Sequence, residues 1–216
     1  MASPVSDPRF SFYAITDQAS AQGRNDLEVA KGLIAGGCSC LQYRAKKVSA
    51  KEQWPMAFAL RALCLQAGVL FVVNDRLDLA LDCGADGVHL GQDDLPLFAA
   101  RRLAGKKMLL GRSTHSLEQA KRAEAEGADY IGYGPLYATA TKENNVPPVG
   151  PQSLGPVLEA LSIPVVAIGG IKINHLEALA QQGARHIAVV TALTGAPDVA
   201  AETSRFTQAW QALTRN

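Results

Sequence analysis

Three polar residues at alternate positions, Gln42, Arg44 and Lys46, continue from the short apolar run at residues 40–43. Side chains of an extended segment alternate between its two faces, so these three are expected on the same side. Two cations and an amide that leave a buried strand together suit an anionic ligand. The segment therefore predicts an anion site, with an ordinary solvated strand end as the alternative.

Two carboxylates follow the next two apolar runs. Asn74 and Asp75 come directly after the run at residues 69–73, and Asp94 follows the run at residues 87–90. Each of these residues alone is compatible with an ordinary helix cap. Adjacent strand ends that each supply a carboxylate also fit Mg²⁺, which proteins bind through one or two carboxylates together with substrate phosphates. We therefore predict that Asp75 and Asp94 hold Mg²⁺.

The longest segment between two apolar runs, residues 134–153, contains Thr139, Thr141 and Lys142. Long loops in compact domains are commonly functional. Two hydroxyls and an ammonium group within four positions suit phosphate oxygens, with a solvated mobile loop as the alternative.

Small residues follow the last two apolar runs, where Gly169 and Gly170 come after the seventh and Thr191 after the eighth. Backbone amides and a helix N-terminus at such positions favour a phosphate, and a glycine pair allows it to approach closely. Ser113 and His115 follow the fifth run and are free to face the same pocket.

The elements that must position these residues repeat along the chain. We expect eight strands, at residues 12–15, 40–43, 69–73, 87–90, 108–111, 130–133, 165–168 and 186–190. The segments between them have helical spacing and begin with residues at the capping-box interval: Asn25 with Glu28, Ser49 with Glu52, Ser116 with Gln119, and Asn174 with Glu177. They end at glycines suited to a left-handed cap: Gly37, Gly68, Gly84, Gly127 and Gly183.

Alternating strands and helices predict an α/β fold with a parallel sheet. Eight units in 216 residues leave about 27 residues for each, which fits a (β/α)8 TIM barrel formed by one domain over residues 1–216. An open doubly wound sheet is the competing fold, but the first strand is not followed by its glycine-rich phosphate turn.

Composition limits the partners. The chain is 48% hydrophobic and carries 21 basic against 20 acidic residues, which excludes disorder and offers no charge footprint for nucleic acid or an anionic membrane. We see no signal sequence or membrane span, and the four cysteines form no paired motif. We therefore expect a cytoplasmic protein that binds small molecules. The sequence leaves a homo-oligomer open.

Together these residues predict two anion sites and one Mg²⁺ site around one barrel mouth. Two phosphorylated groups held side by side suggest a transferase whose leaving group is diphosphate. The residues alone do not identify the organic groups.

An ordered set of motifs resembles the thiamine-phosphate synthase family over nearly the whole chain. The motifs are QYRAK, VNDR, HLGQDD, GRSTHS, GPLYATATK, AIGGI and VVTAL. The resemblance implies thiamine biosynthesis, with condensation of 4-amino-2-methyl-5-(diphosphomethyl)pyrimidine and 4-methyl-5-(2-phosphoethyl)thiazole, or its carboxylate form. The products are thiamine phosphate and diphosphate, and the implied mechanism is dissociative and Mg²⁺-assisted.

The resemblance also implies a role for each motif residue. Gln42 and Asn74 would lie beside the pyrimidine, and Ser113 would contact the pyrimidine or the nascent cation. The diphosphate would be held by Arg44, Lys46, Thr139, Thr141 and Lys142, with Mg²⁺ on Asp75 and Asp94. The thiazole phosphate would be bound by Gly170, Val190 and Thr191, beside Gly169. The catalytic residues would be Arg44, Lys46, Ser113 and Lys142.

Two alternatives share the fold. A thiazole tautomerase would use His115 as its acid or base, but it would have no need of Asp94 or of the hydroxyls and lysine near residue 140. A non-catalytic regulatory barrel would bind thiamine-related phosphates without turnover.

Overall fold

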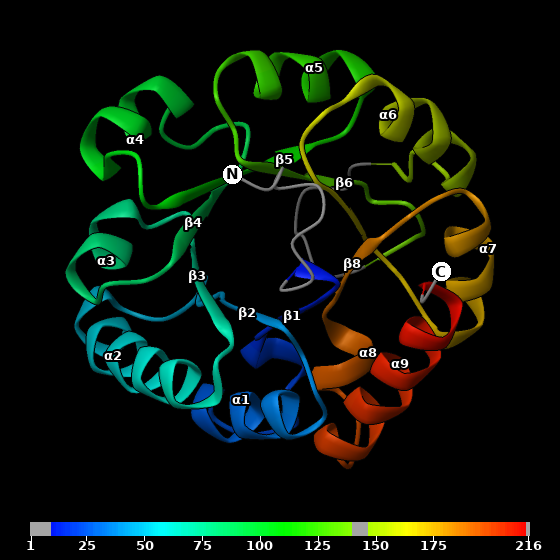
Figure 1. Ribbon diagram of the computed structural model, residues 1–216. Helices are drawn as coiled ribbons and strands as arrows, with labels where there is room; N and C mark the ends of the chain where they lie inside the picture. Colours follow the sequence, from blue (N-terminus) through cyan, green and yellow to red (C-terminus); the bar gives the residue numbers. More distant parts are fainter. Residues whose placement is uncertain (1–9, 140–146, 215–216) are drawn as a thin grey trace.

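Eight parallel strands form a closed barrel in the computed structural model, which describes residues 10–139 and 147–214 (Figure 1). Each strand pairs with its sequence neighbours, and β1 pairs with β8 to close the ring. The strands are β1 (Phe12–Ile15), β2 (Cys40–Tyr43), β3 (Leu70–Asn74), β4 (Gly87–Leu90), β5 (Leu109–Thr114), β6 (Tyr130–Tyr133), β7 (Val165–Ile168) and β8 (His186–Val189). The predicted TIM barrel is confirmed.

The strand ends differ from the prediction most at β5. This strand continues to Thr114 because Ser113 and Thr114 pair with Gly132 and Tyr133 of β6. Ser113 therefore sits on a strand rather than in the loop that the sequence suggested. The fixed direction of a strand gives its side chain a more definite orientation than a loop would.

Helices form the outer ring of the barrel (Figure 1). They are α1 (Asp26–Ala35), α2 (Ala50–Ala67), α3 (Leu77–Asp82), α4 (Leu97–Ala104), α5 (Leu117–Ala125), α6 (Leu154–Ala160), α7 (Leu176–Gln181), α8 (Thr191–Thr194) and α9 (Val199–Thr214). Short 3₁₀ turns are η3 (Gln18–Ser20), η4 (Pro151–Ser153) and η5 (Ile173–His175). Among the described residues, no helix is both long and apolar enough to cross a membrane.

Most of the predicted helix caps are present. Asn25 and Ser49 form complete capping boxes, and Ser116 accepts a hydrogen bond from the backbone of Gln119. The expected cap at Asn174 is wrong, because η5 occupies that position and α7 begins only at Leu176. The predicted terminal glycines all have positive φ, as an αL exit requires.

Two apolar layers follow from the alternation of side chains along each strand. The inner layer fills the barrel and includes Tyr13, Cys40, Val72 and Tyr130. The outer layer lies between the strands and the helices, so every strand is buried on both faces. The inner layer is the floor on which any ligand at the barrel mouth must rest.

The first and last helices pack closely because α1 presents glycine to α9. A Cβ at Gly36 would lie 2.7 Å from the Ala200 carbonyl oxygen and would also meet the Thr203 side chain. The Thr207 hydroxyl donates to the Gly36 carbonyl at 2.8 Å. This contact holds the two ends of the chain together outside the β1–β8 seam.

We predict that Gly36→Ala lowers the free energy of unfolding by about 1–3 kcal/mol, because the added methyl group overpacks this contact. Gly36 has φ −77°, so alanine is not strained by the backbone there. The matched control is Gly155→Ala in α6, where a Cβ meets no atom within 4 Å, and it should be neutral or slightly stabilising. Urea denaturation of both variants tests this, and equal stability would contradict the packing account.

Candidate functional site

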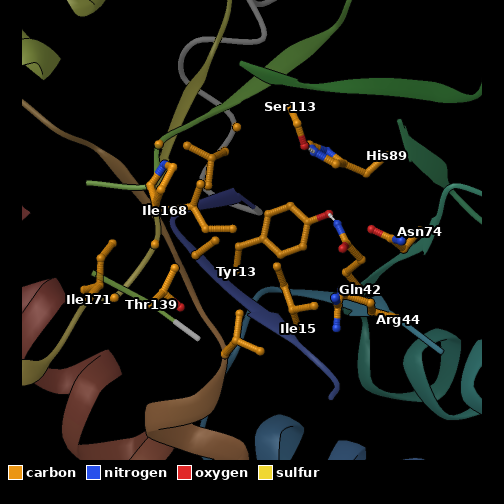
Figure 2. A pocket seen from close by; sticks show the side chains of 18 of the residues that line it. Tyr13, Ile15, Gln42, Arg44, Asn74, His89, Ser113, Thr139, Ile168 and Ile171 are labelled. Atoms are coloured by element: carbon orange, nitrogen blue, oxygen red, sulfur yellow. Dashed lines mark hydrogen bonds between the residues drawn. The ribbon is translucent and has the colours of Figure 1, made fainter. Parts of the chain in front are cut away.

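One cavity at the carboxyl ends of the strands brings together most of the predicted substrate-binding residues (Figure 2). Its lining includes Gln42, Arg44, Asn74, Ser113, Thr139, Gly169, Gly170, Val190 and Thr191. These residues come from β2, β3 and β5 and the segment after β2 on one side, and from the segments after β6, β7 and β8 on the other. Thr141 and Lys142 lie outside the described residues.

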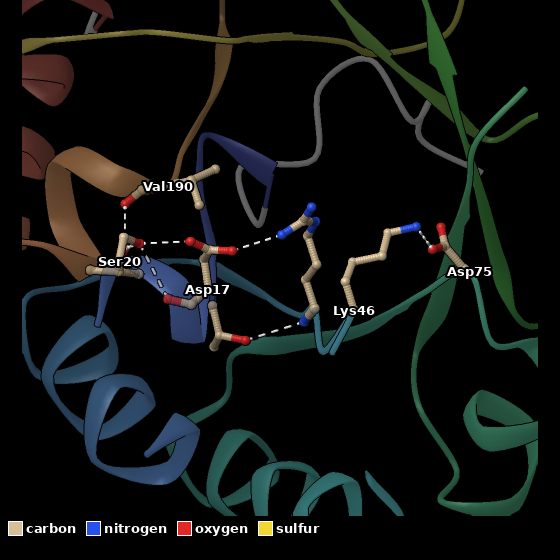
Figure 3. A network of polar contacts seen from close by, with 8 residues as sticks. Asp17, Ser20, Lys46, Asp75 and Val190 are labelled. Carbon is tan, nitrogen blue, oxygen red and sulfur yellow. Dashed lines mark hydrogen bonds and ion pairs between the residues drawn. The ribbon is translucent and has the colours of Figure 1, made fainter. Parts of the chain in front are cut away.

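Arg44 is oriented by an ion pair that the sequence did not suggest (Figure 3). Its guanidinium Nη1 donates to Asp17 Oδ1 at 2.7 Å, and both side chains are largely buried. The backbone N–H of Arg44 donates to Thr16 Oγ1 at 3.2 Å. The loop after β1 thus fixes the cation that leaves β2.

The same aspartate connects through two hydroxyls to α8 and to Val190, which follows the last strand (Figure 3). Ser20 donates to Asp17 Oδ2 at 2.8 Å, and its oxygen lies 2.5 Å from Thr194 Oγ1. Thr194 also contacts the Val190 carbonyl oxygen at 3.3 Å. Side chains around the two predicted anion sites therefore share one hydrogen-bonded network across the β1–β8 seam.

Lys46 lies beside a second hollow rather than in the main cavity, since β2 has ended before it. Its ammonium group pairs with the Asp75 carboxylate (Figure 3). Asn74 lines both hollows. Asp75 has φ +62°, a left-handed conformation uncommon for residues other than glycine. Strained residues of this kind cluster at functional sites.

The Asp94 carboxyl group lies close enough to Asp75 to affect the pKa of its carboxyl. Burial raises the pKa of the Asp75 carboxyl above its ordinary value, Lys46 lowers that pKa, and the neighbouring Asp94 raises it again. Asp94 Oδ2 accepts a hydrogen bond from the backbone N–H of Gly91 at 2.6 Å, within the loop after β4. Asp94 is not the cap of α4, because that helix begins later, at Leu97.

This pair fits the predicted Mg²⁺, because a cation would offset the cost of holding two carboxylates together. In the described parts of the chain, no group of three or more His, Cys, Asp or Glu side chains is placed to hold a metal. A site of two carboxylates completed by substrate phosphates is the arrangement typical of Mg²⁺.

On the side of the cavity away from Asp75, Gly169 and Gly170 allow the segment after β7 to pack closely against the segment after β6. Their φ angles are +99° and +64°. A side chain at Gly169 would collide with Pro135, and one at Gly170 would collide with the Tyr137 backbone. The segment after β6 is hydrogen-bonded here, since the Tyr137 N–H donates to the Gly169 carbonyl at 3.0 Å. The close packing therefore carries Thr139 into the cavity wall.

Thr191 begins the short helix α8 at the cavity edge, and Val190 is the residue before it. The first amides of a helix have no partner within that helix, so they are available to an anion. This geometry agrees with the phosphate position expected after the last two strands of a TIM barrel.

Among the cavity residues that sequence reasoning missed are Tyr13, His89 and Tyr130. Their polar atoms form hydrogen bonds between Gln42 on one side and Ser113 on the other. Each lies within a strand that reads as fully buried. The alternation of side chains along β1 could have indicated Tyr13, because Tyr13 shares its strand face with Ile15 and both line the cavity.

His115 also lines the cavity, and its Nδ1 lies on the Gly134 carbonyl oxygen. A carbonyl only accepts, so Nδ1 carries a proton. The imidazole is held in one orientation at the mouth.

A closed barrel with polar side chains gathered at the carboxyl ends of its strands defines a TIM-barrel enzyme. Comparison with known proteins adds the family. The family model described as thiamine monophosphate synthase matches residues 12–193. The thiamine-phosphate synthase of Methanospirillum hungatei is 45% identical over 194 residues, covering 90% of this chain and 94% of that protein. The enzyme of Pelotomaculum thermopropionicum is 46% identical over 190 residues, covering 88% and 87%.

A solved structure agrees. Thiamine phosphate pyrophosphorylase from Pyrococcus furiosus superposes with a TM-score of 0.88 at 33% identity, covering 95% of this chain and 98% of that one. 3-Hexulose-6-phosphate synthase, at 16% identity and a TM-score of 0.67, shares the fold alone. The chain belongs to the thiamine monophosphate synthase family, and it is a transferase of thiamine biosynthesis.

We predict that Asp75→Asn raises the free energy of unfolding of the metal-free protein by about 0.5–1.5 kcal/mol at neutral pH. The amide removes one of two adjacent negative charges, and asparagine readily adopts positive φ. Urea denaturation provides the measurement.

The comparison variant is Asp75→Ala, which removes the same charge but places a Cβ-bearing residue without a polar side chain at φ +62°. It should be less stable than Asp75→Asn. An asparagine variant less stable than the original protein would contradict this account of the carboxylate pair.

Proposed function

We propose that the chain condenses 4-amino-2-methyl-5-(diphosphomethyl)pyrimidine with 4-methyl-5-(2-phosphoethyl)thiazole, or its carboxylate form, to give thiamine phosphate and diphosphate. The observation that carries this proposal is the single cavity that extends from Arg44 to Thr191, beside the Asp75–Asp94 pair. Two phosphorylated molecules need two anion-binding ends, and their reacting atoms need a common space between them. Family membership supports the same reaction.

The diphosphate belongs at the β2–β4 side. Arg44 reaches the cavity already oriented by Asp17, so little ordering is left for substrate binding. Lys46 stands beside the carboxylate pair, and Thr139 enters from the segment after β6. Thr141 and Lys142, which lie outside the described residues, would complete this end. Asp75 and Asp94 would hold Mg²⁺, which supplies further neutralisation of diphosphate charge when it is bound.

The rings belong in the middle of the cavity. Ile15, Ile168 and Val190 give it apolar walls, and Gln42, Asn74 and Ser113 supply polar contacts for the pyrimidine. The thiazole phosphate would lie over Gly169, Gly170 and Thr191. Apolar walls have a second effect, because they exclude water that would capture a pyrimidine cation before the thiazole does.

The proposed reaction needs no general base, because every electron pair is accounted for by the two substrates. The C–O bond between the pyrimidine methylene and the diphosphate breaks, and the diphosphate keeps the electron pair. The amino group of the pyrimidine donates electron density to the methylene cation. The thiazole nitrogen then forms the C–N bond with its lone pair. The chain stabilises the departing charge with Arg44, Lys46 and Lys142, and it holds the second ring in place.

The tautomerase alternative gains one point from the structure, since His115 lies in the cavity with its Nδ1 held by the Gly134 carbonyl oxygen. The carboxylate pair favours the synthase, because a tautomerase handles no diphosphate. A regulatory barrel would retain the cavity and bind both phosphates without turnover.

An assay with both substrates and Mg²⁺ tests the proposal, with thiamine phosphate detected by its fluorescence after oxidation. We expect turnover. Substrate binding without product would favour the regulatory barrel, and isomerisation of the thiazole carboxylate without condensation would favour the tautomerase.

We predict that Asp75→Ala and Asp94→Ala each lower the rate about 100-fold, because each removes half of the proposed Mg²⁺ site. Affinity for thiazole phosphate should change less than about twofold, since that ligand lies across the cavity. Thermal unfolding gives a readout apart from activity: with diphosphate present, Mg²⁺ should raise the melting temperature of the original protein but not of the variants. Full rates at limiting Mg²⁺ would show that the metal assignment is wrong.

We predict that Asp17→Asn lowers kcat/KM for the pyrimidine diphosphate about tenfold, because Arg44 loses the charge that orients it. Glu202→Gln, which breaks an ion pair with Arg205 on the surface of α9, is the matched control and should leave kcat/KM unchanged. Steady-state kinetics measure both. Equal kcat/KM values in the two variants would show that Asp17 does not orient Arg44 for the diphosphate.

A further inference from the structure

Five side chains form a continuous hydrogen-bonded path across the floor of the cavity. Figure 2 shows four of them, Gln42, Tyr13, His89 and Ser113. Gln42 Nε2 donates to the Tyr13 hydroxyl at 2.8 Å, and the hydroxyls of Tyr13 and Tyr130 lie 3.0 Å apart. The Tyr130 hydroxyl lies 3.1 Å from His89 Nδ1, and His89 Nε2 lies 3.0 Å from Ser113 Oγ. The path crosses five strands: β2, β1, β6, β4 and β5.

Both tyrosines are sealed inside the barrel, with 2% of Tyr13 and none of Tyr130 exposed. Burial raises the pKa of each phenol well above its ordinary value, so both remain protonated at any physiological pH. Each phenol therefore has a single proton to donate. All five side chains line the cavity, and the two ends of the path, Gln42 and Ser113, are the proposed pyrimidine contacts.

One direction of the path uses each proton within it. An amide nitrogen only donates, so Tyr13 accepts from Gln42, and in this arrangement Tyr13 donates its own proton to Tyr130. Tyr130 then gives its proton to His89 Nδ1, which must be unprotonated to accept it. The proton of the neutral imidazole is consequently on Nε2, which donates to Ser113 Oγ.

We propose that Tyr13, Tyr130 and His89 are positioning residues that fix the Gln42 carbonyl oxygen and the Ser113 hydroxyl proton toward the cavity. Gln42 then offers an acceptor and Ser113 a donor. This inference rests on the proposed function and deepens it. The Gln42 carbonyl oxygen can accept a hydrogen bond from the exocyclic amino group of an aminopyrimidine, but it would repel the carbonyl oxygen of a pyrimidinone. The path therefore makes the site prefer the aminopyrimidine.

The opposite direction is the competing arrangement. If the Gln42 amide were reversed, every proton along the path would shift, and His89 would carry its proton on Nδ1 instead of Nε2. The imidazole tautomer therefore reports which end of the amide faces the cavity. This readout requires no substrate and no turnover.

The first experiment is ¹⁵N NMR of the imidazole nitrogens in the substrate-free protein, with the His89 signals assigned from a His89→Gln variant. We expect the neutral Nε2–H tautomer in the original protein. Tyr130→Phe removes the donor to Nδ1 and should shift His89 to a mixture of tautomers. An Nδ1–H tautomer in the original protein would overturn the proposal, and so would an unchanged tautomer in Tyr130→Phe.

The second experiment compares kcat/KM for the aminopyrimidine diphosphate with that for its pyrimidinone analogue. Tyr13→Phe leaves the Gln42 amide free to reverse, so the preference for the amino ring should fall about tenfold. Tyr133→Phe is the matched control, since Tyr133 lies on β6 with Tyr130 but packs in the outer layer. Its preference should be unchanged.

The outcomes separate the two claims. Lack of turnover by the original protein would refute the proposed function, and the tautomer would still decide the direction of the path. Turnover with an unaltered ring preference in Tyr13→Phe would overturn the positioning role while leaving the synthase activity in place. A loss of folding in either phenylalanine variant would show in its melting temperature, and the tautomer of the original protein then decides alone.

Discussion

The pairing of β1 with β8 is the contact on which the site depends, because it closes the sheet into a ring. In an open sheet, the exits of β2 and β8 would lie near opposite edges. Closure places Arg44 and Thr191 on one cavity. The Asp17–Ser20–Thr194 network crosses this seam inside the mouth, and the α1–α9 contact covers it from outside. The two anion-binding ends are thus a consequence of topology.

The mouth contains interactions that cost stability, and the apolar layers offset them. Asp75 combines a left-handed backbone with a neighbouring carboxylate, and a row of polar side chains crosses the barrel interior. Proteins break local rules of this kind mainly at functional sites. The inner and outer layers, which bury the strands on both faces, hold these residues in place. The barrel is therefore most regular in its walls and least regular where ligands would bind.

The strands, the αL glycines and most of the strand-end residues could be predicted from the sequence, because their signals are local. A glycine after a helix, or three polar residues at alternate positions, can be recognised from a few neighbouring residues. Asp17, Tyr13 and Tyr130 could not be assigned in this way. Their roles depend on which residues of other strands share their layer, and register across a closed barrel is set by pairing far apart in the chain. Lys46 shows the limit of local periodicity, because β2 ends before it and its side chain turns to Asp75.

In the proposed reaction the barrel mouth holds two phosphorylated groups at once, at opposite ends of one cavity. Calorimetric titration can measure this simultaneous binding. Thiazole phosphate is titrated into the protein alone and into protein saturated with diphosphate and Mg²⁺. The account predicts one thiazole phosphate bound per chain in both cases, with similar or tighter affinity when diphosphate is present. Competition, in which saturating diphosphate abolishes thiazole phosphate binding, would show that the mouth has a single anion site and would contradict the account.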